Sequence, residues 1–463
     1  MTQVQDITSP MTPMERKATF SLAAIYALRM LGLFMILPVL ALFTEEMEGA
    51  TPLLVGLAIS IYGLTQALLQ IPFGLMSDRF GRKKIIIIGL LLFASGSIIA
   101  ALSDTIYGIL IGRALQGSGA IAAAIMALAA DLTQEAHRTK AMASIGISIG
   151  LSFAVAITLG PIIAGLAGIQ GIFWLTAGLA FMAIMVVAWI VPNPEQSKIH
   201  PDTELIPSQF SKVLKDFNLL RLDYGIFILH LILTSSFVVV PLLMRDAGLI
   251  QEQHWMVYLP VMLFSMVFVI PFIILAEKKR KMKTVFTGAI ALLVIANLGL
   301  FLFYQNLAGI ITFLLLFFCG FNLLEATLPS LISKTAPGDL KGTAMGAYSS
   351  AQFMGAFVGG TLGGWIYGQF GADMVFIYCA LFACSWLVIS LFMQTPQHLA
   401  NLLISLDNIE ENDTSGFIAE LLKIKGVAEV KPHFKEAIAY LKVDNQVLDK
   451  NQLQNLILQW TTA

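Results

Sequence analysis

Four ionisable side chains lie inside long apolar runs of the sequence, where a charge is costly. Arg29, Arg113, His230 and Glu325 each stand within a run of about 20 or more mainly apolar residues, the length needed to cross a bilayer. A charge at the bilayer centre costs at least about 2.5–3.5 kcal/mol, so it needs a partner or a water-filled cavity. We therefore expect these four side chains to line one polar cavity, where they bind substrate or couple its movement to protons.

The four side chains offer different chemistry. Glu325 can bind and release a proton, whereas Arg113 keeps its proton and can only bind an anionic group or influence neighbouring ones. Each also has a structural interpretation. Arg113 could extend its charge to the interface, His230 could be a hydrogen-bonded packing histidine, and Glu325 could pair with a neighbouring lysine. Asp223, near the start of its run, is expected at the interface.

Twelve apolar runs are long enough to position these side chains in a membrane. The runs cover residues 18–43, 53–76, 85–102, 106–130, 141–168, 171–191, 221–245, 254–276, 284–303, 307–333, 342–368 and 374–393. The charged side chains fall in the first, fourth, seventh and tenth runs, as expected if four three-helix units surround one cavity. The predicted fold is an all-α membrane protein with twelve transmembrane helices in two six-helix bundles, plus a small α+β C-terminal domain.

Composition supports a membrane protein and excludes several other classes. The chain of 463 residues is 57% hydrophobic and only 12% charged, whereas a soluble domain carries about 25% charged residues. The net charge of -1 gives no basis for binding nucleic acid. Cys319, Cys379 and Cys384 stand in apolar runs without metal-ligand spacing, so neither a metal nor a cofactor is expected. Common hydrolase and nucleotide-binding motifs are missing from the sequence, which argues against an enzyme.

The distribution of lysine and arginine predicts the orientation. If the N-terminus is cytoplasmic, the segments on the cytoplasmic side of the membrane contain nineteen basic residues. The segments on the outer side contain one, Arg245. Short loops rich in basic residues remain in the cytoplasm. Both termini are therefore predicted to be cytoplasmic.

The two sets of six runs resemble each other. IPFGLMSDRFGRKK from Ile71 matches IPFIILAEKKRKMK from Ile270 at an offset of 199 residues. HRTKAMA from His137 matches LKGTAMG from Leu340 at an offset of 203, which also pairs three glycines of one half with three of the other. Nearly constant offsets indicate duplication, and duplicated halves are typical of transporters that hold substrate between them.

The expected domains follow from these runs. Residues 17–191 form the N-terminal bundle, 192–220 a polar, proline-containing cytoplasmic linker, 221–393 the C-terminal bundle and 401–463 a cytoplasmic domain. Within the last segment, two helices and three strands are expected in the order βαββα, which fits a ferredoxin-like fold. This domain has six basic and nine acidic residues and no cysteine, so nucleic acid and metal carriage are not expected. The expected role of this domain is to bind a cytoplasmic ligand or partner.

Three motifs resemble those of the major facilitator superfamily over about residues 17–393. GLMSDRFGRKK, Gly74 to Lys84, resembles the family's motif between helices 2 and 3, and GRALQGSGA, Gly112 to Ala120, resembles its helix 4 motif. LGPIIAGLAG, Leu159 to Gly168, is similar to a helix 5 motif of drug:proton antiporters, although Ala156 stands where a further glycine is common. The resemblance adds Gln116 to the cavity residues and assigns the helix 5 motif to Gly160, Pro161 and Gly165.

The motif between helices 2 and 3 makes physical sense as a cytoplasmic gate. Gly74 permits close helix packing, and Gly81 permits a tight turn. Asp78 would be stabilised by a helix N-terminus, for which the segment after Pro337-Gly338 is the candidate. Arg82 would pair with a carboxylate, and Asp131 is the expected partner. The full set of gating residues is Gly74, Asp78, Arg79, Gly81, Arg82 and Asp131. In the second copy, Glu277 replaces the aspartate and Arg280 the glycine, so that gate is expected to be degenerate.

Together these features predict a multi-pass secondary transporter of the cell inner membrane. The resemblance implies proton-coupled efflux of small amphipathic or drug-like compounds by alternating access, with the substrate, protons and the lipid bilayer as its partners. Two alternatives stay open: proton-coupled uptake of a small metabolite, and a transporter-derived sensor that acts through its C-terminal domain.

Overall fold

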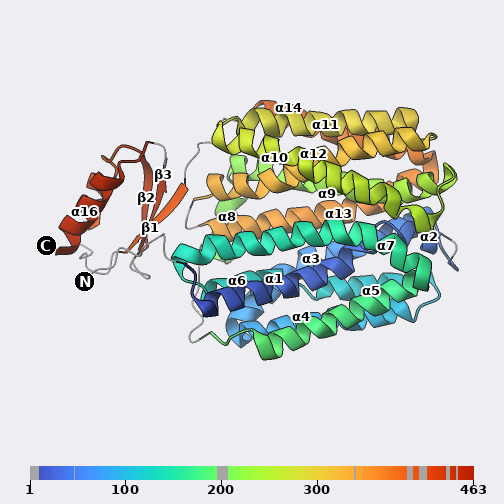
Figure 1. The fold of residues 1–463 in the computed structure, drawn as a ribbon, viewed down its shortest axis with the longest axis horizontal. Helices are drawn as coiled ribbons and strands as arrows, with labels where there is room; N and C mark the ends of the chain where they lie inside the picture. The colour runs from blue at the N-terminus through green and yellow to red at the C-terminus, as the bar shows by residue number, and fades with distance from the viewer. Residues whose placement is uncertain are drawn as a thin grey trace.

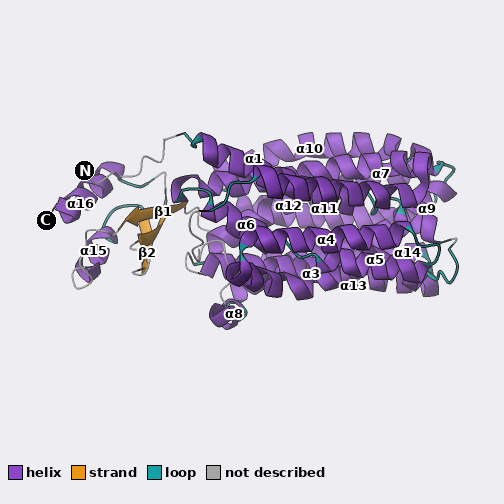
Figure 2. Cartoon of the chain, turned by 90° about the horizontal axis from the view of Figure 1, so that it is seen from below, coloured by secondary structure: helices purple, strands orange, loops and turns teal. Residues whose placement is uncertain are grey.

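The computed structural model describes residues 10–45, 47–194, 207–337, 340–393, 400–405, 414–433, 438–444 and 447–462. Most of these residues form long helices that run along one common axis (Figures 1 and 2). A small sheet with two helices lies beyond one end of this bundle. We call this end the tail end and the opposite end the far end.

The bundle helices follow the predicted runs closely. They are α1 (Pro13–Phe34), α2 (Leu40–Thr44), α3 (Pro52–Phe80), α4 (Arg82–Ala101), α5 (Ile106–Ser118), α6 (Ala122–Asp131), α7 (Glu135–Met185), α9 (Phe217–Asp246), α10 (Trp255–Lys278), α11 (Met282–Phe303), α12 (Leu307–Thr335), α13 (Lys341–Phe370) and α14 (Ala372–Leu391). Among the described residues, ten helical stretches are long and apolar enough to span a membrane.

Two local features explain why ten membrane-spanning stretches are found where twelve were predicted. The 51-residue α7 covers two predicted runs, and it bends sharply at Gly168, where φ is 65° and ψ is -175°. Only glycine adopts such a conformation readily, so Gly168 allows a reversal within one residue. The 30-residue α13 is rich in glycine and is not among the ten stretches. Other predicted runs are interrupted: the first after Phe34, and the fourth around Gly119.

The expected linker differs from the structure at its end. Part of it, residues 195–206, lies outside the described residues. The remainder contains a short helix, α8 (Pro207–Val213), and α9 already begins at Phe217. Asp216 caps α9, because its Oδ1 accepts a hydrogen bond from the Asn218 N–H over 2.9 Å. This cap starts the helix within the polar segment, before its apolar run.

Two helices, α3 and α13, form a seam between the N-terminal and C-terminal halves. A Cβ atom on Gly56 would collide with the Gly360 carbonyl oxygen and lie 2.9 Å from the Gly364 Cα atom. Near the middle, the Ser60 Oγ and Thr361 Oγ1 atoms are 3.1 Å apart. Close approach of two helices through small residues is a common packing mode in membranes. The seam therefore holds α3 and α13 together by backbone proximity.

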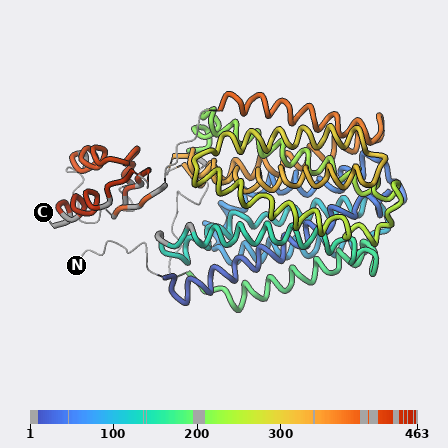
Figure 3. The backbone as a smooth tube through the Cα atoms, turned by 45° about the horizontal axis from the view of Figure 1, so that its top comes forward, coloured from blue at the N-terminus to red at the C-terminus, as the bar shows by residue number. Residues whose placement is uncertain are grey.

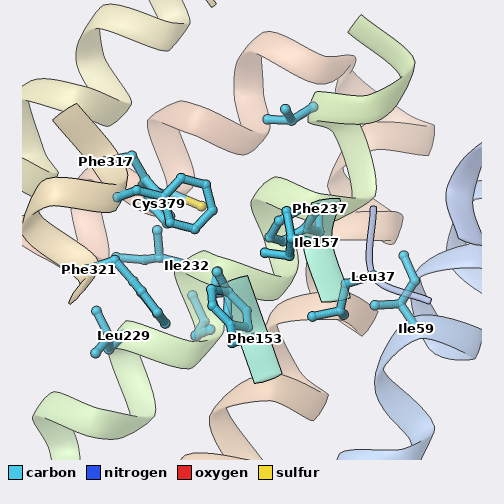
Figure 4. Packing of buried hydrophobic residues seen from close by; sticks show 14 of the residues in the cluster. Leu37, Ile59, Phe153, Ile157, Leu229, Ile232, Phe237, Phe317, Phe321 and Cys379 are labelled. Carbon is cyan, nitrogen blue, oxygen red and sulfur yellow. The ribbon is translucent and has the colours of Figure 1, made fainter. Parts of the chain in front are cut away.

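The hydrophobic core joins the two halves at the far end. One buried cluster includes Met35–Leu42 and Ile157 of the N-terminal half together with most of the C-terminal half. A second cluster, around Leu22, Phe93 and Leu128, has its buried residues in the N-terminal half towards the tail end, and Phe353 of α13 packs against it. Figure 4 shows Phe153 and Ile157 of α7 among Leu229, Phe237 and Phe321 of the C-terminal half. The halves are thus packed together more extensively at the far end.

The C-terminal region is a separate α/β unit at the tail end, on the same side as the start of α1 (Figure 3). It contains β1 (Ala400–Ser405), α15 (Thr414–Leu421), β2 (Val427–His433), β3 (Ile438–Val443) and α16 (Lys450–Thr462). The strands form an antiparallel sheet in the order β1-β3-β2. The buried side chains include Phe417, Leu421 and Leu441. The predicted βαββα order is present in the described residues.

Candidate functional site

The expected gating residues meet at the turn between α3 and α4. Gly81 has φ 100° and ψ 133°, a backbone conformation that favours glycine, and it lets α4 begin directly at Arg82. Arg82 forms an ion pair with Asp78, and its Nε atom lies 3.3 Å from Asp131 Oδ2. Its Nη1 atom also donates to Ser77 Oγ over 3.1 Å. The expected contact between Arg82 and Asp131 is therefore present, and it connects three helix ends.

Two members of the motif have supporting contacts rather than charge partners. A Cβ on Gly74 would lie 3.3 Å from the Ala123 Cβ, so glycine permits close packing of α3 on α6. The Arg79 guanidinium lies 5.5 Å from the centre of the Phe80 ring. The expected helix N-terminus beside Asp78 is not its partner in the described residues, where Asp78 pairs with Arg82. Gly338, in the proposed helix start, lies outside the described residues.

The second copy of the motif has its own ion pair. Glu277 lies 2.6 Å from Lys334 Nζ, and its Oε1 accepts a hydrogen bond from Ser330 over 3.1 Å. Arg280 has φ 54°, a left-handed conformation at the position where the first copy has Gly81. The second loop therefore has a residue with positive φ at this position, although arginine replaces the glycine of the first copy.

Arg29 and Arg113 form one cluster inside the N-terminal half. The Arg29 Nη2 atom donates to Tyr62 Oη and Gln66 Oε1, both over 2.7 Å, and to the Gly119 carbonyl over 2.9 Å. Its guanidinium lies 5.6 Å from the centre of the Phe93 ring. These contacts hold the charge of α1 against α3, α4 and the break between α5 and α6.

Arg113 is held against α3 by backbone and amide oxygens. Its Nη2 and Nε atoms donate to the carbonyls of Ile59 and Ala58 over 3.1 and 3.3 Å, and its Nη1 donates to Gln116 Oε1 over 2.9 Å. Gln116 Nε2 then donates to Ser97 over 2.8 Å. The Tyr62 ring centre lies 5.2 Å from the Arg113 guanidinium and 5.9 Å from that of Arg29. The Tyr62 ring thus makes cation–π contacts with both guanidinium groups.

His230 and Glu325 form a second cluster, inside the C-terminal half. The His230 Nε2 atom is 3.9 Å from Glu325 Oε2 and 2.8 Å from Gln352 Nε2. Gln352 Nε2 also donates to Glu325 Oε1 over 3.3 Å. The cluster therefore joins α9, α12 and α13 near the middle of the bundle, with an imidazole and a carboxylate that can exchange protons.

The five predicted cavity residues fall into two clusters, Arg29, Arg113 and Gln116 in one half and His230 and Glu325 in the other. Arg29 and Arg113 are 0% and 1% exposed, whereas the Glu325 side chain is 37% exposed. The printed hydrogen bonds of both arginines stay within their own half, although Arg29 Nε and Nη1 are buried without a hydrogen-bond partner among the described residues. The two clusters are neighbours nonetheless, because the Tyr62 ring on α3 contacts the Phe353 ring on α13, with centres 6.3 Å apart.

The helix 5 motif lies at the far end, where the two halves pack closely. A Cβ on Gly160 would collide with the Met35 carbonyl, and one on Gly165 would lie 2.7 Å from Glu252 Cγ. Pro161 stands within α7 between them. The motif therefore permits close contacts with α1 and with the segment before α10.

An ion pair also joins the halves at the far end. Arg245 Nη1, near the end of α9, donates to Glu45 Oε2 over 2.8 Å. Both side chains are more than a third exposed, at 38% and 39%. Together with the helix 5 contacts, this pair closes the far end.

Several polar residues were missed because the sequence search considered only charges in apolar runs. Tyr62, Gln66 and Gln352 are neutral, although an amide inside an apolar run is a comparable signal. Asp223 was expected at the interface, but it is only 7% exposed because α9 extends beyond it to Phe217. Among the described residues, no group of three or more His, Cys, Asp or Glu side chains could hold a metal ion.

A buried pair at the tail end was also missed. His137 Nδ1 lies 3.0 Å from Glu15 Oε1, and the same carboxylate oxygen accepts the Gln134 N–H over 2.8 Å. Glu15 completes a capping box with Thr12 at the start of α1. The pair braces α1 against the start of α7.

Comparisons with known proteins agree on one family. The family model described as Major Facilitator Superfamily matches residues 22–360. The chain is 48% identical over 454 residues to the inner membrane transport protein YajR of Escherichia coli (strain K12), covering 97% of this chain and 99% of that protein. It is also 37% identical over 350 residues to an uncharacterized transporter of Buchnera aphidicola subsp. Acyrthosiphon pisum, covering 75% and 89% of the two chains.

Solved structures show the same fold at low sequence identity. The human organic anion transporter MFSD10 (TETRAN) has a TM-score of 0.62 and 19% identity, covering 82% of this chain and 100% of that chain. A bacterial homologue of the human lysosomal transporter Spinster, in an inward-facing and occupied conformation, has a TM-score of 0.69 and 12% identity, covering 82% and 97%.

Proposed function

The chain belongs to the Major Facilitator Superfamily, and from this premise we propose that it exports small amphipathic or drug-like compounds in exchange for protons. It is a multi-pass transporter of the inner membrane and not an enzyme. The choice of antiport over uptake rests on the helix 5 motif, Gly160, Pro161 and Gly165, whose resemblance is to drug:proton antiporters.

The proposed architecture has twelve spans in two pseudo-symmetric bundles. Two spans are added to the ten if α7 is divided at Gly168 and if α13 is counted with its neighbours. Residues 17–191 and 221–393 then form the bundles, joined by the linker 192–220. For the C-terminal domain, 401–463, a ferredoxin-like fold is supported by the strand order β1-β3-β2.

The tail end is proposed to face the cytoplasm. The basic loop segments Arg82–Lys84 and Lys278–Lys281 lie at this end, as the positive-inside rule requires. With the far end closed by Glu45 and Arg245, this arrangement corresponds to an inward-facing state. The gating residues around Asp78 and Arg82 are then in their open position, paired within the N-terminal half.

The observation that carries the proposal is the pairing of His230 with Glu325 in the middle of the C-terminal half. The Glu325 side chain is 37% exposed, which gives water or substrate access to it, although its Oε2 atom, 3.9 Å from the imidazole, is itself buried. A carboxylate in a membrane span is costly, so one that is present there commonly has a function such as proton transfer. Arg29, Arg113 and Gln116 supply fixed positive charge and hydrogen bonds within the N-terminal half, on the other side of the seam from this group.

The proposed direction of transport, from inside to outside, can be tested by drug tolerance. The gene is expressed in a strain that lacks its own efflux pumps, and tolerance to a panel of amphipathic cations and neutral drugs is measured. Increased tolerance that disappears in Glu325→Gln supports proton-driven export. Growth on a new nutrient without any change in tolerance would favour uptake and overturn the proposed direction.

A further inference from the structure

The side-chain amide of Gln352 lies between the two titratable groups of the C-terminal cluster. Its Nε2 atom is 2.8 Å from His230 Nε2 and 3.3 Å from Glu325 Oε1. An amide nitrogen carries two hydrogens and no acceptor site, so one N–H serves each partner. Gln352 therefore donates to both the imidazole and the carboxylate.

This arrangement fixes the tautomer of His230. Because Gln352 donates to Nε2, that nitrogen must be the acceptor of a neutral imidazole. The proton then resides on Nδ1, which lies 3.3 Å from the Ile226 carbonyl and can donate to it. A neutral imidazole nitrogen has a single lone pair, so His230 Nε2 can accept only one hydrogen bond.

A proton on Glu325 would compete for that lone pair. Glu325 Oε2 is buried without a hydrogen-bond partner, and His230 Nε2 is 3.9 Å away. Once Oε2 binds a proton it becomes a donor, and His230 Nε2 is the nitrogen acceptor beside it. A small movement of either side chain would replace the bond from Gln352 with one from Glu325.

The turn that carries Gln352 also carries contacts across the seam. Ser350 Oγ accepts a hydrogen bond from Gln70 Nε2 on α3 over 2.5 Å, and the Gly346 carbonyl accepts from the same nitrogen over 3.2 Å. The Phe353 ring contacts the Tyr62 ring, which in turn lies beside both arginines. A shift or rotation of this turn would therefore change the contacts between the halves.

We propose that Gln352 is a positioning residue that couples the protonation of Glu325 to the packing of α13 on α3. With Glu325 ionised, Gln352 holds the α13 turn to His230 and Glu325. With Glu325 protonated, the imidazole bonds to the carboxylic acid, so the turn loses its bond to His230, keeps only the one to Glu325 Oε1, and is freer to move with α3. The inference rests on the proposed function, because it takes Glu325 as the proton carrier.

Among the described residues, Tyr348 of α13 interacts electrostatically with both Glu325 and Asp223 of α9. The parts of α7 and α10 packed near α12 contribute uncharged side chains, Phe153 and Ser265. Substitution of Gln352 consequently isolates the hydrogen-bond link without removing a charge.

Two measurements on the purified full-length protein separate the steps. Infrared difference spectra follow the carboxylic acid band of Glu325, assigned by its loss in Glu325→Gln. Spin labels on Phe80→Cys and Ile274→Cys, in a background with the three native cysteines replaced by serine, report the distance between the halves at the tail end. In the parent protein, both signals should change with pH around the same midpoint.

In Gln352→Met, the Glu325 band should still titrate, but the pH-driven change in the ratio of open to closed populations should shrink by about 2- to 10-fold, as for loss of one hydrogen bond. Gln352→Ala provides a second variant if methionine does not fold. Asn322→Leu is the matched control, because Asn322 donates to Ser265 within the same half. An unchanged distance response in both Gln352 variants, with Glu325 still titrating, overturns the inference alone. Absence of any Glu325 titration overturns the proposed function instead.

Discussion

Arg280, on the turn between α10 and α11, donates a hydrogen bond through Nη2 to Asp444 Oδ1 of the C-terminal domain over 2.6 Å. Next to this pair, Lys442 Nζ donates to the Lys334 carbonyl at the end of α12 over 3.2 Å. In the N-terminal half, the corresponding turn pairs its arginine with Asp131 of the same half. The C-terminal domain therefore provides the second turn with a carboxylate from outside the bundle.

Breaking this contact should loosen the C-terminal domain without affecting the membrane helices. The pair is partly exposed, at 37% and 21%, so Asp444→Asn should cost about 0–1 kcal/mol of docking free energy. Hydrogen exchange of residues 438–443 measures this change, and a double-mutant cycle with Arg280→Ala isolates the pair. Glu420→Gln is the control, because Glu420 bonds to Trp460 inside the domain. Equal protection in Asp444→Asn and in the parent protein would remove the docking role.

Asp78→Asn should slow transport and leave membrane insertion unchanged. The substitution removes the charge that pairs with Arg82, so the turn between α3 and α4 loses part of its fixed geometry. We expect turnover in reconstituted vesicles to fall by about 3- to 10-fold, in keeping with the loss of a charge-assisted hydrogen bond. Arg79→Gln, which changes a residue stacked on Phe80, should have a smaller effect. Proton-driven flux equal to that of the parent protein would contradict the gating role.

Glu325→Gln should remove the pH dependence of substrate binding. Glutamine resembles the protonated acid in shape and charge, so the variant should bind at every pH as the parent protein does at acidic pH. In an antiporter, that is the weakly binding form. Isothermal titration across the pH range with one compound from the tolerance screen tests this, with Asp246→Asn as a carboxylate control on an exposed helix end. A variant whose affinity still varies with pH excludes Glu325 from proton coupling.

Arg245→Ala should favour opening of the far end. The lost pair with Glu45 is solvent-exposed, so the population shift should be modest, about 2- to 5-fold. Maleimide labelling of Leu37→Cys reports the change, because Leu37 is only 7% exposed in the far-end core. Asp246→Asn leaves the Glu45 pair intact and serves as the comparison. Labelling at the same rate in both backgrounds would mean that the ion pair does not hold this end closed.

Gly56→Val should destabilise the protein by forcing the seam apart. A Cβ at this position would collide with the Gly360 carbonyl, a backbone atom that cannot rotate away, so we expect a cost of about 1–3 kcal/mol. Thermal unfolding of the purified protein provides the measurement. Gly288→Val is the matched control, because a Cβ there would meet nothing within 4 Å. A melting temperature of Gly56→Val equal to that of the control would argue against tight packing at the seam.

The helices were predictable from the sequence because apolar length is a direct physical requirement of the bilayer. The runs 284–303 and 307–333 nearly coincide with α11 and α12. Breaks inside runs were less predictable. Gly168 lies among many glycines, and its positive φ depends on how the chain reverses at the far end.

The candidate site was only partly predictable, because partners come from distant parts of the chain. The contact of Arg82 with Asp131 followed from charge and the ends of two helices. The grouping of Arg29 with Arg113 rather than with Glu325 did not follow, since it depends on the hydrogen bonds from Arg29 Nη2 to Tyr62 and Gln66. Gln352 was overlooked because a neutral amide carries no electrostatic cost that a search for charges would detect.

The seam between α3 and α13 also has a consequence for how a compound enters. On that flank, contacts extend from Pro52 and Gly368 at the far end to Gln70 and Gly346 towards the tail end. On the opposite flank, Gly146 and Gly150 of α7 have open space beside them, and the close approach of Gly165 to Glu252 is near the far end. The first flank can therefore serve as a hinge, so that a compound would enter between the halves on the opposite flank, where they can separate.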